Sequence, residues 1–421
     1  MLRSLRPIRI IAQGATIGLV LAAGARAAPT NPDEEHSDLG FTAEMATAHD
    51  TNEFRLNDGV PPSSLGIATT RRSDITFTPS LSVDGTLYAS RQTLSFLAGV
   101  ARQDFEYAKT FNQTYKNYLI DWQWQIGNEW DGDASSSLSE SLSSFAYVVS
   151  SIPNRQDSHT QHVLAQWHPR PDRRLAFRFD QNRGLNSLSA FNILDFRNTT
   201  VRTELAADSA LGHEIVLGVS QTRTEYPNRV IINFAPIDNS FRQHQVDIST
   251  RIAFSGKSGM DLLYGYARRH YPDVPDRDFS GSVGNFALNW EATSHVGLTA
   301  SITRDLNALD DLFRLYTVTT TAKAGLRHEL SSKVVLEGGQ NAARADYKGE
   351  PNNLYTLFYG HAPERVDKER DSYASLSWVP RDRWKVRFDF THAVRQSSIP
   401  GFPYHDDTVR LDLQYRIGRS L

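Results

Sequence analysis

Apolar and polar residues alternate along most of this chain, in stretches of about ten residues that recur to its end. A period of two places successive side chains on opposite faces of a β-strand. In the last stretch, Val409 and Leu411 fall on one face, while Arg410 and Asp412 fall on the other. Three earlier stretches show the same pattern: 174–180, 245–252 and 385–390. We therefore predict strands with one apolar face and one charged face.

The connections between these stretches are alternately short and long. The short ones carry turn sequences such as GNE at 127–129 and SGKS at 255–258, which are typical of hairpins. The long ones are polar or mixed, as at 50–72, 143–157 and 348–368. Bacterial outer-membrane barrels combine short periplasmic turns with long outer loops. The pattern predicts an all-β fold, an antiparallel up-and-down transmembrane barrel with both termini in the periplasm.

Counting the stretches predicts about eighteen strands, with sixteen as the alternative. The even number agrees with a closed barrel whose two ends lie on the same side. The pattern is weakest at 129–142, which is rich in serine, and at 333–347, which is rich in glycine and alanine. The expected strands are 40–50, 73–84, 91–106, 115–126, 129–142, 159–168, 173–181, 198–208, 212–225, 241–254, 258–270, 279–291, 294–304, 315–329, 333–347, 369–379, 383–396 and 406–418.

Composition and the N-terminal sequence give the domain organisation. Outside the N-terminus no apolar run approaches the roughly 20 residues of a spanning helix, and the mean hydropathy is −0.45. Arg3, Arg6 and Arg9 precede an alanine-rich apolar stretch, which predicts a signal peptide at 1–27. A periplasmic segment at 28–39 and one barrel domain at 40–421 follow. The sequence thus predicts a protein secreted to the outer membrane of a Gram-negative bacterium, in contact with its lipid.

Tryptophan placement supports the same topology. Six of the seven tryptophans lie within a few residues of a predicted short turn: Trp124, Trp130, Trp167, Trp290, Trp378 and Trp384. Indole rings favour the interface between membrane and water, so they predict an aromatic girdle at the periplasmic rim. Core tryptophans that happen to flank turns are the alternative.

Several short motifs carry a resemblance to a known family. They are Asn52, Phe54, Arg55 and Leu56 in TNEFRL; Ser90-Arg91-Gln92; Asn117-Tyr118; Asp121-Trp122-Gln123-Trp124; and Asp278-Phe279-Ser280-Gly281 followed by Trp290. Together they resemble the outer-membrane β-barrel proteins of exopolysaccharide biosynthesis operons, the EpsL type, which are themselves similar to a group of β-barrel porins. The resemblance implies an exopolysaccharide chain as cargo, and periplasmic and inner-membrane polysaccharide assembly proteins as partners. It implies no catalytic residue. The chain ends in Leu421, whereas such barrels usually end in an aromatic residue.

The polar strand faces predict the lining of the lumen. An eighteen-stranded barrel is wide enough for a water-filled channel. Charges of both signs, with many hydroxyl and amide groups, suit a neutral or weakly charged polyol, and so favour a sugar chain over a small ion. Alternatively, these charges pair across the wall and only brace the barrel. The predicted pore-lining residues are Arg178, Asp180, Arg202, Glu204, Asp247, Arg251, Lys323, Arg327, Lys385, Arg387, Asp389, Arg410, Asp412 and Arg416.

Two outer loops carry aromatic clusters. In 348–368 we identify Tyr355, Phe358 and Tyr359 as candidates for stacking on sugar rings, and 185–197 contains Phe191 and Phe196. Clustered exposed aromatic residues usually have a binding partner. Packing of these residues against neighbouring loops is the alternative. We expect Tyr355→Ala and Tyr359→Ala to weaken sugar transport if the first interpretation holds.

The sequence offers no convincing catalytic or metal site. There is no HExxH or GxSxG motif, no cysteine and no glycine-rich phosphate loop. Asp157, Ser158, His159 and His162 cluster near one predicted rim, but a spacing of three turns the two histidines to opposite faces of a strand. We predict no enzyme, no cofactor, no metal and no nucleic-acid partner. A passive conduit for exopolysaccharide, a non-conducting scaffold of the secretion complex and a general diffusion porin remain as functions.

Overall fold

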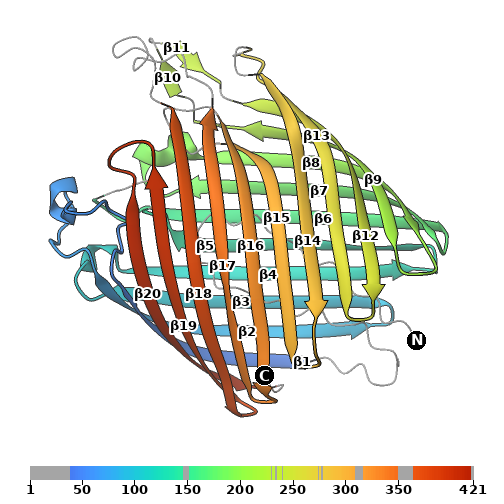
Figure 1. Ribbon diagram of the computed structural model, residues 1–421, viewed down its shortest axis with the longest axis horizontal. Helices are drawn as coiled ribbons and strands as arrows, with labels where there is room; N and C mark the ends of the chain where they lie inside the picture. The colour runs from blue at the N-terminus through green and yellow to red at the C-terminus, as the bar shows by residue number, and fades with distance from the viewer. Residues whose placement is uncertain are drawn as a thin grey trace.

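The protein forms one closed antiparallel β-barrel of 18 strands, shown in Figure 1. The computed structural model describes residues 38–145, 151–228, 230–232, 235–238, 240–273, 275, 278–308, 316–348 and 364–418. Each strand pairs with its neighbour in sequence, with β9 next to β12, and β1 pairs with both β2 and β20. The pairing of the first and last strands closes the wall, so the barrel has no free strand edge.

The strands of the first half of the wall are β1 (Asp38–Asp50), β2 (Asp74–Ala89), β3 (Gln92–Phe105), β4 (Gln113–Ile126), β5 (Trp130–Leu142), β6 (Arg155–Arg170), β7 (Arg173–Asn186), β8 (Phe196–Asp208) and β9 (Glu214–Glu225). The second half consists of β12 (Phe241–Ser255), β13 (Ser258–His270), β14 (Phe279–Glu291), β15 (Val296–Ala308), β16 (Tyr316–Ser331), β17 (Val334–Lys348), β18 (Arg365–Arg381), β19 (Trp384–Ser397) and β20 (Tyr404–Ile417). A separate hairpin pairs β10 (Val230–Ile232) with β11 (Ala235–Ile237). Three short 3-10 helices lie in long connections: η2 (Pro62–Leu65), η3 (Lys109–Phe111) and η4 (Ser189–Leu194).

The prediction of eighteen barrel strands is confirmed. The two weakest stretches form full strands, β5 and β17, because the backbone ladder needs no particular side chain once both neighbours are in register. The β10–β11 hairpin and the three 3-10 helices were not predicted, since their sequences lack a regular period. No helix among the described residues is long and apolar enough to span a membrane.

The register places apolar side chains in rows on the outside of the wall. Leu376, Phe388 and Leu411 are direct neighbours on β18, β19 and β20, and they are 40%, 45% and 45% exposed. On β12 and β13, Val246 lies beside Tyr266 in the same way. On β19 and β20, the charged residues Arg387, Asp389, Arg410 and Asp412 occupy the alternate positions and face inward. This arrangement is inverted relative to a soluble protein and fits a wall surrounded by lipid.

Short and long connections alternate around the whole barrel. The eight short ones have two to five residues each, and the long ones have six or more. Both described ends of the chain, Asp38 and Gly418, therefore lie at the end of the barrel that carries the short turns. That this end faces the periplasm stays a prediction. The expected signal peptide and most of the segment at 28–39 lie outside the described residues.

The six tryptophans near short turns lie at that same end. Trp130, Trp290, Trp378 and Trp384 are 39–49% exposed on the outer face. Trp130 stacks on Trp167 with 6.1 Å between ring centroids. These rings form part of an aromatic girdle at the short-turn rim, as the sequence predicted.

Candidate functional site in the lumen wall and at the mouth

The inner face of the wall carries all fourteen residues predicted to line the pore. Each occupies the strand position alternate to an exposed apolar residue, as Arg178 does beside Phe177 and Asp412 beside Leu411. They are distributed over β7, β8, β12, β16, β19 and β20, so they surround the lumen and are not gathered at one point. Whether solutes pass along them stays a prediction.

Most of these charges are neutralised within the wall. Among the described residues, eleven of the fourteen form an ion pair with an oppositely charged side chain, and Asp180 contacts the imidazole of His162. Lys323 and Lys385 form no ion pair with a described residue. Arg387 pairs with Asp389 at 2.8 Å, and Arg410 pairs with Asp412 at 2.8 Å. These two pairs lie side by side with opposite order, so each arginine also faces the other strand's aspartate. The bracing that we considered as an alternative is therefore present, and it leaves a lining of mixed sign.

Two arginines cross a glycine to reach an aspartate two strands away. Arg202 on β8 passes over Gly218 on β9 and donates two hydrogen bonds of 2.6 Å to Asp247 on β12. Arg416 on β20 passes over Gly40 on β1 and binds Asp84 on β2.

At both glycines, a Cβ atom would overlap the guanidinium group. A bidentate pair between arginine and carboxylate is among the stronger polar contacts in proteins. The second of these joints spans the seam where the barrel closes.

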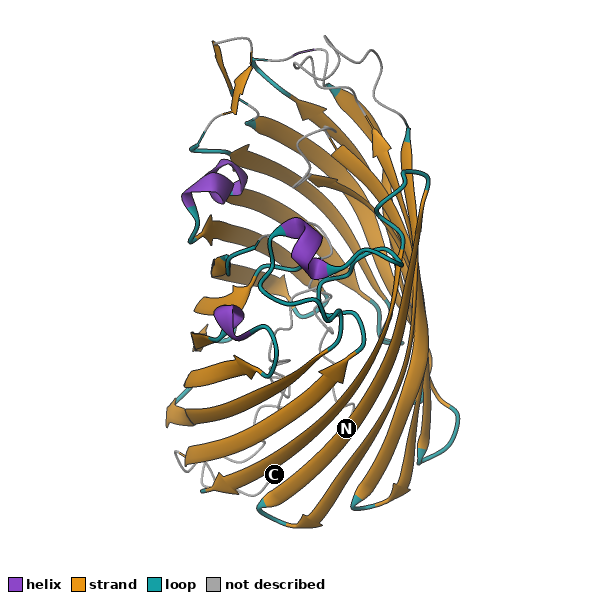
Figure 2. Cartoon of the chain, turned by 90° about the vertical axis from the view of Figure 1, so that its left-hand side faces the viewer, coloured by secondary structure: helices purple, strands orange, loops and turns teal. Residues whose placement is uncertain are grey.

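At the opposite end of the barrel, three long connections share a small dry core. Phe54 from 51–73, Phe111 from 106–112 and Phe145 from 143–154 pack with ring centroids 4.9–5.7 Å apart. Phe54 and Phe111 are completely buried. Leu56, Ile67, Phe105 and Ala108 complete this group, which we call the mouth cluster. Figure 2 shows the loops and 3-10 helices that lie across this end of the barrel.

The TNEFRL motif ties the mouth cluster to the closing seam. Asn52, 2% exposed, donates from its backbone N–H to Asp406 and from Nδ2 to the carbonyl groups of Leu56 and His405. Arg55 has a left-handed backbone (φ 54°) and pairs with both Asp50 and Asp406, at 2.9 and 3.1 Å. The motif that carries the family resemblance thus binds the first loop to the last strand.

Glu53, in the same motif, lies among other acidic groups. Burial, together with the neighbouring Asp74 and Asp406, raises the pKa of Glu53 to about 7, although the Arg55 guanidinium opposes this shift. A carboxyl group in this environment favours its neutral form. The loop that contributes Phe54 to the mouth cluster therefore also carries a carboxyl group that titrates near neutral pH.

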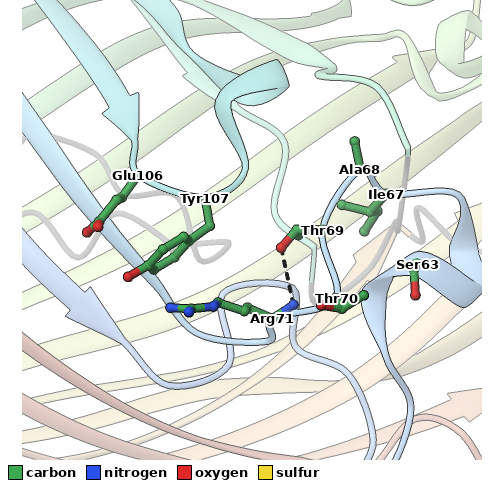
Figure 3. Close-up of a pocket in the computed structure, with 8 residues that line it drawn as sticks. All are labelled: Ser63, Ile67, Ala68, Thr69, Thr70, Arg71, Glu106 and Tyr107. Carbon is green, nitrogen blue, oxygen red and sulfur yellow. Dashed lines mark hydrogen bonds between the residues drawn. The ribbon is translucent and has the colours of Figure 1, made fainter.

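A cavity of about 550 Å³ opens beside the mouth cluster and is shown in Figure 3. Its lining residues are Ser63, Ile67, Ala68, Thr69, Thr70, Arg71, Glu106 and Tyr107. The Arg71 guanidinium lies 4.1 Å from the Tyr107 ring centroid, and the Arg71 backbone N–H donates to Thr69 Oγ1 at 3.1 Å.

Asp74 holds one wall of this cavity by accepting the backbone N–H groups of Glu106, Tyr107 and Ala108 at 2.8–3.1 Å. No pattern in the sequence predicts this site, because its two sides come from different loops.

Two further candidates from the sequence are an aromatic loop cluster and the cluster of Asp157, Ser158, His159 and His162. Tyr355, Phe358 and Tyr359 lie outside the described residues. His162 lies on the inner face between Asp133 and Asp180, at 3.2 and 2.5 Å. Asp157 pairs with Arg155 at 2.8 Å, so no Ser/His/Asp relay forms here among the described residues.

Two other motifs that carry the resemblance, Ser90-Arg91-Gln92 and the one that begins at Asp278, form hydrogen bonds between neighbouring strands or turns. Arg91 donates to the Gly127 carbonyl and to Asn128 Oδ1, and Trp122 Nε1 donates to Gln92 Oε1 at 3.0 Å. These bonds connect the β2–β3 turn with the β4–β5 turn. Asp278 accepts from His270 and from the backbone of Tyr271 at the start of β14. None of these motifs carries catalytic geometry.

Comparison with known proteins gives one family match. The family described as "Putative beta-barrel porin 2" matches residues 250–417. No curated protein matches the chain. The match covers less than half of the chain, and together with the closed barrel it supports an outer-membrane β-barrel with a porin-like fold.

Solved structures with a similar fold include Pseudomonas aeruginosa OccK2 (OpdF), with 9% identity, a TM-score of 0.48, and coverage of 91% of this chain and 98% of that chain. Acinetobacter baumannii OccAB3 has 8% identity and a TM-score of 0.46, with coverage of 91% and 99%. The alcaligin receptor FauA of Bordetella pertussis has 11% identity and a TM-score of 0.44, with coverage of 90% and 76%.

Proposed function

We propose that this barrel is a passive conduit for exopolysaccharide across the outer membrane, working with periplasmic and inner-membrane assembly proteins. The observation that carries the proposal is the mixed lining, in which eleven of the fourteen predicted pore-lining charges form ion pairs with described residues of the wall. A lining of this kind has no single-sign ring to select small ions. It presents many fixed donors and acceptors that suit the hydroxyl groups of a sugar chain. The family resemblance of the motifs points to the same cargo.

A non-conducting scaffold is the second candidate, and the mouth cluster favours it. A dry core built from three loops fixes part of the outer opening in one position. A scaffold needs such a rigid outer surface but needs no open path. The two candidates differ in whether ions and sugars pass through the lumen.

Conductance of the purified barrel in planar bilayers distinguishes the conduit from the scaffold. We expect ion currents, and a shift toward cation selectivity when Lys323→Glu and Lys385→Glu are combined, since these two cations lack an ion pair among the described residues. Lys368→Glu is the matched control, because Lys368 lies on the outer face beside Arg344. An absence of current, even after deletion of 350–364, would favour the scaffold.

Secretion by cells then separates the conduit from a general porin. In a strain that lacks this protein, a conduit predicts that finished polysaccharide accumulates in the periplasm while uptake of small nutrients is unchanged. A general diffusion porin predicts the reverse pattern. Restoration of secretion by the native chain would complete the test.

A further inference from the structure

Tyr373 on β18 is an aromatic residue exposed on the inner face of the barrel. Its side chain is 37% exposed. The other large apolar and aromatic side chains that are strongly exposed on the described barrel strands all project outward, in the rows that contain Leu376 and Phe388. Tyr373 pairs in register with Gly339 and Thr391, and so belongs to the face that carries Lys323 and Asp389. A large ring exposed to water has a different role from rings in contact with lipid.

The ring extends over Gly339 on the neighbouring strand β17, and its hydroxyl group reaches Gly325 on β16, the strand after that. A Cβ at Gly339 on β17 would lie 2.7 Å from the Tyr373 hydroxyl oxygen and 2.9 Å from Cε1. A Cβ at Gly325 on β16 would lie 3.2 Å from the same oxygen. Glycine inside a strand weakens it, and it often marks close approach of another group. Here the two glycines let the ring lie along the wall, with one side against the backbone and the other toward the lumen.

Polar side chains flank the ring on both sides along the strands. One row on the same face lies two residues nearer the mouth than Tyr373 and consists of Lys323, Asn341 and Asp371. Arg327, Glu337 and Ser375 form the row on the other side. Same-face rows are about 7 Å apart, within reach of long side chains. The Tyr373 hydroxyl has no hydrogen bond within the described part of the chain.

A hexose in its ring form has an apolar face of C–H groups and a rim of hydroxyl groups. We propose that Tyr373 is a lumenal contact for the hexose units of the transported polysaccharide. Its open ring face packs against the sugar C–H groups, while Lys323, Asn341 and Asp371 bind hydroxyl groups at the rim. A small set of polar groups around an apolar surface is typical of a site that orients its ligand. The proposal rests on the conduit function and adds a position for the sugar within it.

A purely structural role for the ring is the competing explanation, because aromatic residues also stabilise strand glycines by covering them. The chain offers a matched control for this role. Phe96 on β3 covers Gly85 on β2, with Cζ 2.7 Å from the position of a Cβ, but it does so on the outer face. Replacing Phe96 removes this packing of a ring over a strand glycine and leaves the inner face of the barrel unchanged.

The experiment measures block of the bilayer current by maltohexaose, a neutral hexasaccharide. We expect Tyr373→Leu to raise the dissociation constant about tenfold, which corresponds to about 1.4 kcal/mol. Tyr373→Phe keeps the ring and should raise it only two- to threefold, while Phe96→Leu should leave it unchanged. Retention of the folded form in unheated detergent gels checks each barrel. Tyr373→Cys in this cysteine-free chain adds a test of position, since a charged thiol reagent in the lumen should reduce the current.

The outcomes separate this proposal from the proposed function. A native barrel that passes no current would contradict the conduit itself. A conducting barrel that maltohexaose does not block, or that Tyr373→Leu leaves as sensitive as before, would overturn the role of Tyr373 and leave the conduit standing. Equal effects of Phe96→Leu and Tyr373→Leu would assign the ring to stability alone.

Discussion

The barrel wall and the mouth cluster use the same residue types in opposite directions. In the wall, Phe388 points outward and is 45% exposed, while Arg387 and Asp412 on the adjacent positions face inward. In the mouth cluster, Phe54 and Phe111 point inward and are completely buried. The wall is surrounded by lipid and encloses water, whereas the cluster is surrounded by water and encloses only itself. The direction in which an apolar side chain faces is therefore set by the local solvent.

The largest difference in stability between the two regions is expected when a phenylalanine in each is replaced by alanine. Phe54→Ala should destabilise the mouth cluster by about 4 kcal/mol, because it leaves a cavity in a dry core. Phe388→Ala should cost about 1–2 kcal/mol, because lipid fills the space. Hydrogen exchange of 51–73 and urea unfolding in vesicles measure the two effects. Equal costs at both sites would contradict the comparison.

A glycine in the wall should be the next most sensitive position. Gly218→Ala places a methyl group where Arg202 crosses to Asp247, so it should cost about 3 kcal/mol by breaking a buried ion pair. Gly297→Ala on β15 is the matched control, since a Cβ there has open space. Urea midpoints of the two variants provide the measurement. A similar loss in both would mean that strand glycines, and not the crossing arginine, set the stability.

A change of pH should alter the stability of the loop at 51–73, which carries Glu53, more than the stability of the barrel wall. The folded pKa of Glu53, about 7, lies above its usual value of 4.5. Its stabilising contribution is therefore complete below about pH 4.5 and is lost as the pH rises through 7. We expect protease cleavage within 51–73 to be at least about tenfold faster at pH 8 than at pH 5, because the shift of the Glu53 pKa from 4.5 to about 7 exceeds one unit. Glu53→Gln should abolish this dependence; if the dependence persists, another group is responsible.

The smallest effect is expected at an exposed ion pair on the outer face. Arg102 and Asp104 pair at 2.9 Å, with side chains 57% and 35% exposed. Arg102→Gln should change the free energy of unfolding by less than about 0.5 kcal/mol. Arg202→Gln, on the inner face, should cost several times more by leaving Asp247 unpaired. The same urea titrations compare the two, and equal losses would contradict the distinction between exposed and enclosed pairs.

The amino-acid sequence by itself determined the barrel class and the two faces of its strands, and it narrowed the strand number to eighteen or sixteen. Alternation is a local property, so stretches such as 409–417 reveal both their conformation and their apolar side without any knowledge of partners. The same is true of the tryptophans near short turns, whose preference for the interface depends on the side chain alone.

Only the tertiary structure decided which of these residues meet. Arg202 reaches Asp247 because register and a glycine on the intervening strand bring them together, and no period in the sequence encodes that contact. The mouth cluster joins phenylalanines from three loops, and the closing seam joins Asn52 to Asp406 across almost the whole chain. Tyr373 follows the same principle, since its position over two glycines depends on the pairing of three strands. Contacts between distant segments depend on register and closure, which are properties of the assembled wall.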